Sequence, residues 1–458
     1  MIPDADPATD PDLAKQPASL GTRSLRAAGW TVLQIGVSYG LRLGSNLILT
    51  RLLAPDAFGL VGLATTVIIA VSLLSDIGIG RSIIRETDGD QDSFLRAAWT
   101  IKILRSAAIA VVTLIAALVF GLVAPHLAPP GSTYADPTIP WIIAATAVMM
   151  LAAGFESTCV ELASRRIDYR RIAMAQLGVQ MIAQSVTIAT ALIYPTVWAL
   201  VVGMAASTLA SLIASHIAYP GPRMALQVDR DITRRLWVFG RWLILSSALT
   251  FVLRNADKLV LGALLSPTAF GLYAIAVIWV DAAAGVIASL IARIGYSALA
   301  EVAHSRRQDL PKVFHRLQHF VDLAVIAAFA TVWLGADLLI GFLYSDTYAD
   351  VSHYMTLLGF ALFAVRFSPL DELLLTLGDS RAHAVTGTLR LAGLVSGQVI
   401  GWHLAGIDGL ILASALHALT SVPFVLWKLQ RHLPGMSFAR DWIWLAAILT
   451  LAPLAAFL

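Results

Sequence analysis

The chain has too little charge for a water-soluble globular protein. Of its 458 residues, 13% are Asp, Glu, Lys or Arg and 58% are hydrophobic, whereas soluble domains carry about 25% charged residues. Its mean hydropathy is +0.77. The single cysteine, Cys159, excludes an intrachain disulfide. Because a spanning helix needs about 20 apolar residues, the composition predicts an all-α polytopic membrane protein without a large extramembrane domain.

Motifs of several enzyme classes are also missing. The sequence contains no phosphate-cradling Walker loop, no paired cysteines and no His-Glu-x-x-His zinc helix. We therefore expect no ATP hydrolysis, no metal site and no cofactor. Pairs such as Arg165-Arg166 and Arg306-Arg307 could contact nucleic acid, but membrane topology explains their regular placement. We expect anionic membrane lipids as their partners, and no nucleic acid.

Thirteen apolar windows divide the chain. They lie near 27–49, 57–82, 103–125, 139–160, 173–194, 197–218, 237–261, 269–292, 319–343, 354–376, 385–405, 407–427 and 441–458. We therefore expect about 12–14 transmembrane helices. The expected order is a disordered cytoplasmic tail (1–26), a six-helix lobe (27–219), a cytoplasmic linker (220–236), a second six-helix lobe (237–427), and a linker with an extra apolar segment (428–458).

Lysines and arginines are concentrated in every second connection between the apolar windows. Alternate connections hold 27 of the 32, while those near 125–139, 195, 344–353 and 406 hold none. By the positive-inside rule, the basic connections and the amino terminus are cytoplasmic. Five basic residues fall inside or at the ends of the windows instead: Arg42, Arg51, Arg254, Lys258 and Arg366.

The chain contains an internal repeat. A shift of 212 residues aligns 30–64 with 242–276, and 14 of these 35 pairs are identical. Within it, LLAPDAFGL at 52–60 matches LLSPTAFGL at 264–272. Because an even number of windows separates the copies, both run in the same direction through the membrane. A parallel repeat predicts a pseudo-twofold axis along the membrane normal, with the substrate site where the halves meet.

Each copy of the repeat carries a polar stripe. In the first window, polar residues recur every four positions and share one helix face: Gln34, Ser38, Arg42 and Asn46. The equivalent positions of the seventh window hold Ser246, Thr250, Arg254 and Lys258. An arginine at this depth costs several kcal/mol unless it faces water, an anion or a partner. Arg42 and Arg254 therefore either line a polar cavity or are structural, through snorkelling or pairing. A guanidinium in a cavity is well suited to phosphate.

Two further charged residues lie near the middle of windows, Arg366 in the tenth and Asp281 in the eighth. They either pair as a structural bridge or act separately. In the second case Arg366 extends the basic cavity, and Asp281 binds a coupling proton or cation. A run of glutamines in the fifth window could bind sugar hydroxyls or join helices: Gln176, Gln180 and Gln184.

Three short stretches point to a family: TRLLAPDAFGLVGL at 50–63, LLSDIGIGRSIIRE at 73–86 and RRIDYRR at 165–171. With them the chain resembles the oligosaccharide and polysaccharide flippases of the multidrug/oligosaccharidyl-lipid/polysaccharide exporter superfamily. The resemblance implies two six-helix lobes around a central cavity. It also implies a transporter, not an enzyme, that moves undecaprenyl-diphosphate-linked repeat units across the bacterial inner membrane for exopolysaccharide or O-antigen synthesis.

The resemblance further implies that basic cavity residues engage the diphosphate. That role falls on Arg42 and Arg254, with Lys258 and Arg366 as lesser candidates, and the expected partners include a polysaccharide polymerase and export machinery. Two alternatives stay open. A cation-coupled drug antiporter would have an acidic cavity, and a membrane enzyme that polymerises or ligates lipid-linked glycans would need a longer outer loop than the 14 or so residues near 125–139.

Overall fold

The computed structural model describes residues 20–74, 77–291, 299, 302 and 307–455, and these contain helices and turns but no strand. Most of the expected disordered tail, residues 1–19, lies outside the described residues. Helix α1 (Leu20–Leu52) begins within the segment expected to be tail. The first polar stripe therefore lies on one long, continuous helix.

Six long helices form the first lobe: α1, α2 (Pro55–Leu74), α4 (Asp92–Leu127), α5 (Ile139–Gly154), α7 (Tyr169–Ile193) and α8 (Val197–Ile217). Two short helices follow breaks that the apolar windows do not reveal, α3 (Ile79–Arg85) and α6 (Cys159–Arg165). Gly78 precedes α3 with a φ of 68°, a conformation that glycine adopts without steric cost. Helix α6 bends away from α5 by 61°.

The second lobe repeats this order with α9 (Arg230–Leu264), α10 (Pro267–Leu290), α12 (Leu310–Leu343), α13 (Val351–Gly359), α14 (Ala361–Arg366), α15 (Ser368–Thr376), α16 (Ser380–Leu416) and α17 (Val422–His432). Window 354–376 is thus three short helices. Helix α16 breaks at Ala405 and Gly406, and Gly406 has a φ of 60°. The windows 385–405 and 407–427 are therefore two segments that meet at this break. Helix α9 begins inside the expected linker, and α18 (Ala439–Ala455) is the extra segment.

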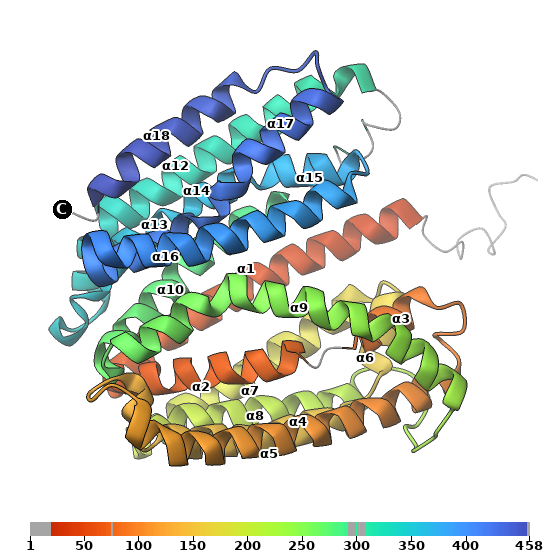
Figure 1. Ribbon diagram of the computed structural model, residues 1–458. Coiled ribbons are helices and arrows are strands. Elements are labelled where there is room, and N and C mark those ends of the chain that lie inside the picture. The colour runs from red at the N-terminus through yellow and green to blue at the C-terminus, as the bar shows by residue number, and fades with distance from the viewer. Residues whose placement is uncertain (1–19, 75–76, 292–298, 300–301, 303–306, 456–458) are drawn as a thin grey trace, which may run out of the picture.

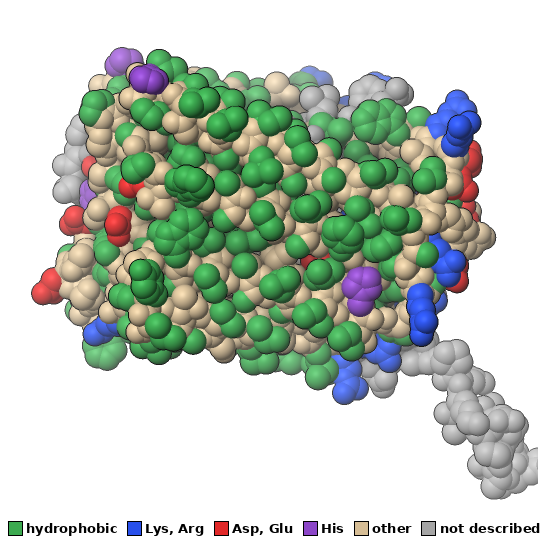
Figure 2. Space-filling view, turned by 90° about the horizontal axis from the view of Figure 1, so that it is seen from below, with side chains coloured by type: hydrophobic (Ala, Val, Ile, Leu, Met, Phe, Trp, Pro, Cys, Tyr) green, Lys and Arg blue, Asp and Glu red, His purple; other side chains and the backbone are tan. Residues whose placement is uncertain are grey.

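The chain is a multi-pass membrane protein. Seven of its described helices are long and apolar enough to cross a membrane, or eight if the bent pair α5–α6 counts as one span. Helices α1 and α9 are not among them because they carry the polar stripes. Figure 2 shows a broad hydrophobic belt, with Lys and Arg side chains gathered mainly toward one end of the molecule. We call the end that holds the Lys- and Arg-bearing connections the basic end.

The two lobes lie side by side, with α1, α9 and α10 between the outer helices of each (Figure 1). At the end opposite the basic end, α2 packs directly on α10. A Cβ atom on Gly59 would overlap the carbonyl oxygen of Pro267, and one on Gly271 would overlap that of Pro55. Since these glycines and prolines are equivalent in the repeat, the contact is reciprocal, which confirms the expected parallel pseudo-twofold arrangement.

Two further contacts join the lobes at this opposite end, which we call the closed end. Each lobe supplies one of them. Tyr348 of the second lobe donates its hydroxyl to the carbonyl of Leu53 at 2.6 Å. Thr133 of the first lobe donates its amide and hydroxyl to the carbonyl of Leu265 at 2.8 and 2.9 Å. Leu53 and Leu265 are again equivalent in the repeat. We call the contact of Tyr348 the 344–348 clasp, because nearby Tyr344 also donates a hydrogen bond to the first lobe. We call the contact of Thr133 the 133–134 clasp, because Tyr134 also donates a hydrogen bond to α9.

Candidate functional site

A cavity of about 790 Å³ lies between the lobes. Helices α1, α2, α7 and α8 of the first lobe and α9 and α10 of the second line it, whereas the described helices α12 to α18 contribute no lining residue. Its polar lining is extensive: Arg42, Ser45, Asn46, Thr65, Thr66, Gln176, Gln180, Gln184, Thr187, Ser207, Arg254, Asn255, Lys258, Tyr273 and Asp281. The repeat thus places two members of each stripe at one cavity between the halves: Arg42 and Asn46 from the first, Arg254 and Lys258 from the second.

Arg42 and Arg254 are the exposed cations of this cavity. Within the described residues, neither guanidinium forms a hydrogen bond or an ion pair. Both keep the full planar fork of donors that binds carboxylate or phosphate bidentately. Lys258 also lines the cavity, but its ammonium donates to the carbonyl of Arg254 at 3.1 Å and contacts Asp257 at 3.5 Å.

The lining carries an excess of positive charge. Among the described lining residues, Asp281 is the one carboxylate beside the three cations Arg42, Arg254 and Lys258. It is close enough to interact electrostatically with each of them. Asp257, which does not line the cavity, accepts a hydrogen bond from the Tyr273 hydroxyl and is partly neutralised by Lys258. The cavity therefore favours an anionic guest.

The stripes divide between this cavity and helix packing. Gln34 donates to Gln176, and Gln180 donates to the carbonyl of Ser38 at 2.9 Å, so this part of the first stripe fastens α1 to α7. Asn46 lines the cavity. In the second stripe Thr250 does not line the cavity, and its hydroxyl donates to the Ser246 carbonyl of its own helix at 2.9 Å. Gln184 lines the cavity and makes no side-chain hydrogen bond to any described residue.

Arg366 does not line the cavity, so both alternatives for it are wrong: it neither pairs with Asp281 nor extends the basic lining. The Arg366 side chain is 0% exposed and donates to Asp322 of α12 at 2.8 Å and to Asp441 of α18 at 2.5 Å. Asp322 also pairs with Arg440. A buried charge is tolerated when it is paired and hydrogen-bonded. Arg366 therefore ties the extra C-terminal helix to the second lobe.

Sequence reasoning missed the aromatic residues that support the cavity wall. Tyr273 is 1% exposed and binds Asp257, while the repeat places Val61 at the equivalent position. Tyr344 contacts Asn46 from the second lobe at 2.8 Å. A buried tyrosine hydroxyl needs a polar partner, so a tyrosine that breaks the repeat was the available signal for Tyr273. No comparable signal marks Tyr344.

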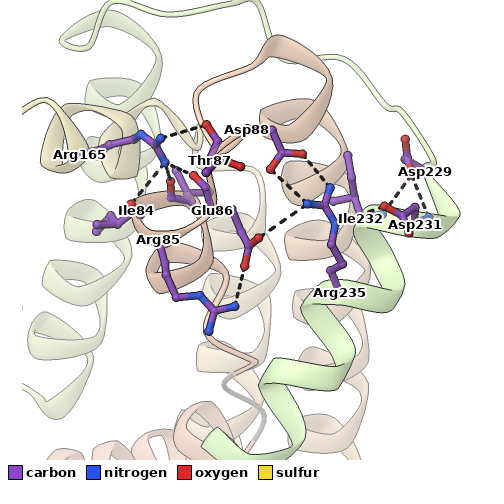
Figure 3. A network of polar contacts seen from close by, with 11 residues as sticks. Ile84, Arg85, Glu86, Thr87, Asp88, Arg165, Asp229, Asp231, Ile232 and Arg235 are labelled. Atoms are coloured by element: carbon purple, nitrogen blue, oxygen red, sulfur yellow. Dashed lines mark hydrogen bonds and ion pairs between the residues drawn. The ribbon is translucent and has the colours of Figure 1, made fainter.

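A second polar network lies at the basic end, where α9 meets the turn between α3 and α4 (Figure 3). Arg235 of α9 binds both oxygens of Asp88, at 2.8 and 3.2 Å, and lies 3.7 Å from Glu86. Arg165 donates to the last carbonyls of α3, including that of Ile83 at 2.6 Å. Arg235 holds the pKa of Asp88 below its ordinary value of 3.8 through this hydrogen bond. Ion pairs thus hold the start of α9 to the first lobe.

Comparison with known proteins identifies the family. The profile of the family described as polysaccharide biosynthesis protein matches residues 48–353. This match covers more than half of the chain, so the protein belongs to that family, as the sequence resemblance leads one to expect.

Individual relatives are distant. The succinoglycan biosynthesis transport protein ExoT of Rhizobium meliloti (strain 1021) is 19% identical over 284 residues. The matched region spans 62% of this chain and about half, 55%, of that protein. The chain is therefore similar to a transport protein of polysaccharide biosynthesis over part of its length.

Two solved structures share the fold. An inward-facing multidrug resistance MATE family transporter of the MOP superfamily matches with a TM-score of 0.66 at 15% identity, over 86% of this chain and 94% of that one. The lipid II flippase MurJ in an inward closed conformation matches with a TM-score of 0.66 at 11% identity, over 93% and 96%. At such identities the likeness shows the fold alone.

Proposed function

We propose that this protein is a flippase for undecaprenyl-diphosphate-linked oligosaccharide repeat units in the bacterial inner membrane. The observation that carries this proposal is that Arg42 and Arg254 face one cavity from equivalent positions of the two lobes, and that neither guanidinium pairs with a described residue. A diphosphate presents two anionic groups, and two planar donor forks are a matched receptor for them. Membership of a polysaccharide biosynthesis family supports a glycan-carrying substrate.

The remaining lining fits the other parts of such a substrate. Lys258 adds a third cation, and the free amide of Gln184 offers a donor and an acceptor to sugar hydroxyls. The basic end, including the amino-terminal side of α1, faces the cytoplasm by the positive-inside rule. Because the clasps close the opposite end, this conformation receives substrate from the cytoplasmic side.

Asp281 is the candidate site for a coupling proton or cation. Its carboxylate balances part of the charge of Arg42, Arg254 and Lys258. A bound diphosphate would compete with Asp281 for the same cations. Protonation of Asp281, or cation binding to it, would relieve that competition, which would link transport to an ion gradient.

The charge of the cavity argues against a cation-coupled drug antiporter, because three lining cations would repel organic cations. A polymerase or ligase role is also disfavoured, since the relatives are transporters and the connection between α4 and α5 is short. We therefore propose a transport role that delivers substrate to a polysaccharide polymerase and export machinery.

The test is translocation of a fluorescent undecaprenyl-diphosphate oligosaccharide in proteoliposomes. We expect transport by the native chain and a loss of about tenfold or more in Arg42→Ala and Arg254→Ala, since a charge-assisted hydrogen bond contributes about 1.5–3 kcal/mol. Arg316→Ala removes an exposed arginine of α12 outside the cavity and serves as the matched control. Native rates in both cavity variants, or transport of small organic cations instead, would overturn the proposal.

A further inference from the structure

Asn46 joins the cavity to the 344–348 clasp. It lies on α1 one helical turn beyond Arg42, lines the cavity and is 6% exposed. Its Oδ1 accepts a hydrogen bond from the hydroxyl of Tyr344 at 2.8 Å, and that hydroxyl accepts one from the indole of Trp279 at 2.8 Å. Because Tyr344 and Trp279 belong to the second lobe, this chain of hydrogen bonds crosses the boundary between lobes.

Asn46 still has donors to offer a ligand. A carboxamide has one acceptor oxygen and two N–H donors. Tyr344 occupies the oxygen. The Nδ2 atom donates to none of the described residues, and it is not fully enclosed by protein. A ligand oxygen held by Arg42 can therefore accept from Nδ2 when the carboxamide turns toward it.

The other clasp lacks this link. The repeat places Lys258 at the position of Asn46, and Lys258 binds the carbonyl of Arg254 and Asp257 of its own helix. Tyr134 donates instead to the carbonyl of Leu259 at 2.8 Å. Of the two otherwise equivalent clasps, the 344–348 clasp alone has a described hydrogen bond to a cavity-lining side chain. The two halves of the closed end are therefore unequal.

We propose that Asn46 is a positioning residue that releases the 344–348 clasp when an anionic ligand occupies the cavity. This inference rests on the proposed function. A phosphate oxygen beside Arg42 accepts from Nδ2, the carboxamide turns toward the ligand, and the bond to Tyr344 is lost. The bond from Tyr348 to the carbonyl of Leu53 and the bond from Arg51 to the carbonyl of Leu343, at 3.1 Å, then hold this end of α1 without the bond from Tyr344. A ligand shifts a conformational equilibrium only through contacts that differ between states, and this is such a contact.

The experiment measures how fast a thiol at the closed end reacts with a maleimide in detergent solution. Cys159→Ala removes the native thiol, and Ala57→Cys places one in the first turn of α2, where Ala57 is 5% exposed. The probe ligand is farnesyl diphosphate. In the Ala57→Cys background we expect the probe to accelerate modification. Adding Asn46→Ala should raise the ligand-free rate by about two- to tenfold, the effect of one hydrogen bond, and abolish the response to the probe.

Tyr348→Phe is the matched control, because it removes a clasp bond that has no contact with the cavity. It should raise the ligand-free rate but keep the response to farnesyl diphosphate. If Asn46→Ala also keeps that response, Asn46 is merely structural and the inference is overturned.

A ligand-free double variant separates this inference from the proposed function. Asn46→Ala combined with Tyr344→Phe should react no faster than Tyr344→Phe alone, since Tyr344→Phe already removes the bond to Asn46 together with the bond from Trp279, and a further increase in the double variant would overturn the link. If farnesyl diphosphate does not accelerate modification in the Ala57→Cys background, the diphosphate ligand and the release step are overturned together. Non-additivity would then still support the contact between Asn46 and the clasp.

Discussion

Arg42 and Arg366 lie at similar depth in their apolar windows, yet their surroundings are opposite. Arg42 is exposed in a cavity and has no ion pair among the described residues, whereas Arg366 is 0% exposed and binds Asp322 and Asp441. A solvated, unpaired guanidinium is free to bind an anion, while a buried one is already committed to its counter-ions. Counter-charge, and not depth, therefore separates a binding arginine from a structural one.

The contrast also assigns a role to the extra C-terminal helix. Asp441 lies near the start of α18 and is 2% exposed. Gln318 of α12 donates to Asp441 at 3.2 Å and to the carbonyl of Arg366 at 3.3 Å. Because these bonds join three helices around one charge, α18 is part of the packing of the second lobe.

The largest expected effect comes from breaking the buried network. Arg366→Met leaves Asp322 and Asp441 buried with fewer partners, so we expect a loss of about 3–5 kcal/mol in the free energy of unfolding. Thermal or denaturant unfolding in detergent measures it. Replacing Asp322 and Asp441 by leucine in the same chain should restore much of the loss. Native stability in Arg366→Met alone would contradict the account of a buried, committed charge.

The cavity arginines should show the reverse pattern. Arg42→Gln and Arg254→Gln should each reduce transport by about tenfold or more, because each removes a charge-assisted contact to the ligand. Their free energy of unfolding should match that of the native chain or be slightly higher, since each substitution removes repulsion between the like charges that line the cavity. Transport per folded molecule and unfolding are measured on the same samples. A destabilisation as large as that of Arg366→Met would remove the distinction between the two regions.

The closed end tests whether the cavity depends on contact between the lobes. A Cβ on Gly59 would overlap the Pro267 carbonyl and lie 2.9 Å from the amide nitrogen of Gly271. Overpacking costs about 1–3 kcal/mol, so Gly59→Ala should reduce the ratio of closed to open molecules by about 5- to 150-fold. Gly62→Ala, one turn away, meets nothing nearer than 3.6 Å and should behave as the native chain. Equal thiol reactivity at position 57 in both variants would count against closure at this contact.

The partly exposed ion pair of Arg235 and Asp88 at the basic end should give the smallest effect. Arg235 is 35% exposed and Asp88 27%, so Arg235→Gln should cost less than about 1 kcal/mol and the loss should shrink in salt. Because the folded pKa of Asp88 is lowered, its contribution is present well above pH 3.8 and is lost as the pH falls through the lowered value. Unfolding of native and Arg235→Gln chains across acidic pH checks this. A gap that persists unchanged below that value would refute the assignment.

Hydropathy and repetition predicted the fold well, but they did not predict where helices break. Window 57–82 contains the end of α2 and the start of α3, and window 354–376 contains three helices. Apolar composition reports burial in a membrane and not the continuity of a helix. Left-handed glycines such as Gly78 and Gly406 produce some breaks, and their φ values depend on tertiary packing.

The candidate site was predictable where the repeat supplied a second observation. Arg42 and Arg254 occupy matching positions, and both line the cavity. Arg366 has no such partner in the repeat, and its counter-ions lie 44 and 75 residues away in sequence. A periodicity argument gives depth and helix face, but it cannot identify a neighbour contributed by a distant helix.

The most direct test of the central claim is equilibrium binding of undecaprenyl diphosphate to the purified chain, with undecaprenol as the uncharged comparison. The account predicts that the native chain and Arg316→Gln bind the diphosphate with equal affinity, and that the double variant Arg42→Gln, Arg254→Gln binds it at least about tenfold more weakly. Binding of undecaprenol should be the same in all three. Undiminished diphosphate binding in a correctly folded double variant would contradict the claim that these two arginines form the anion site.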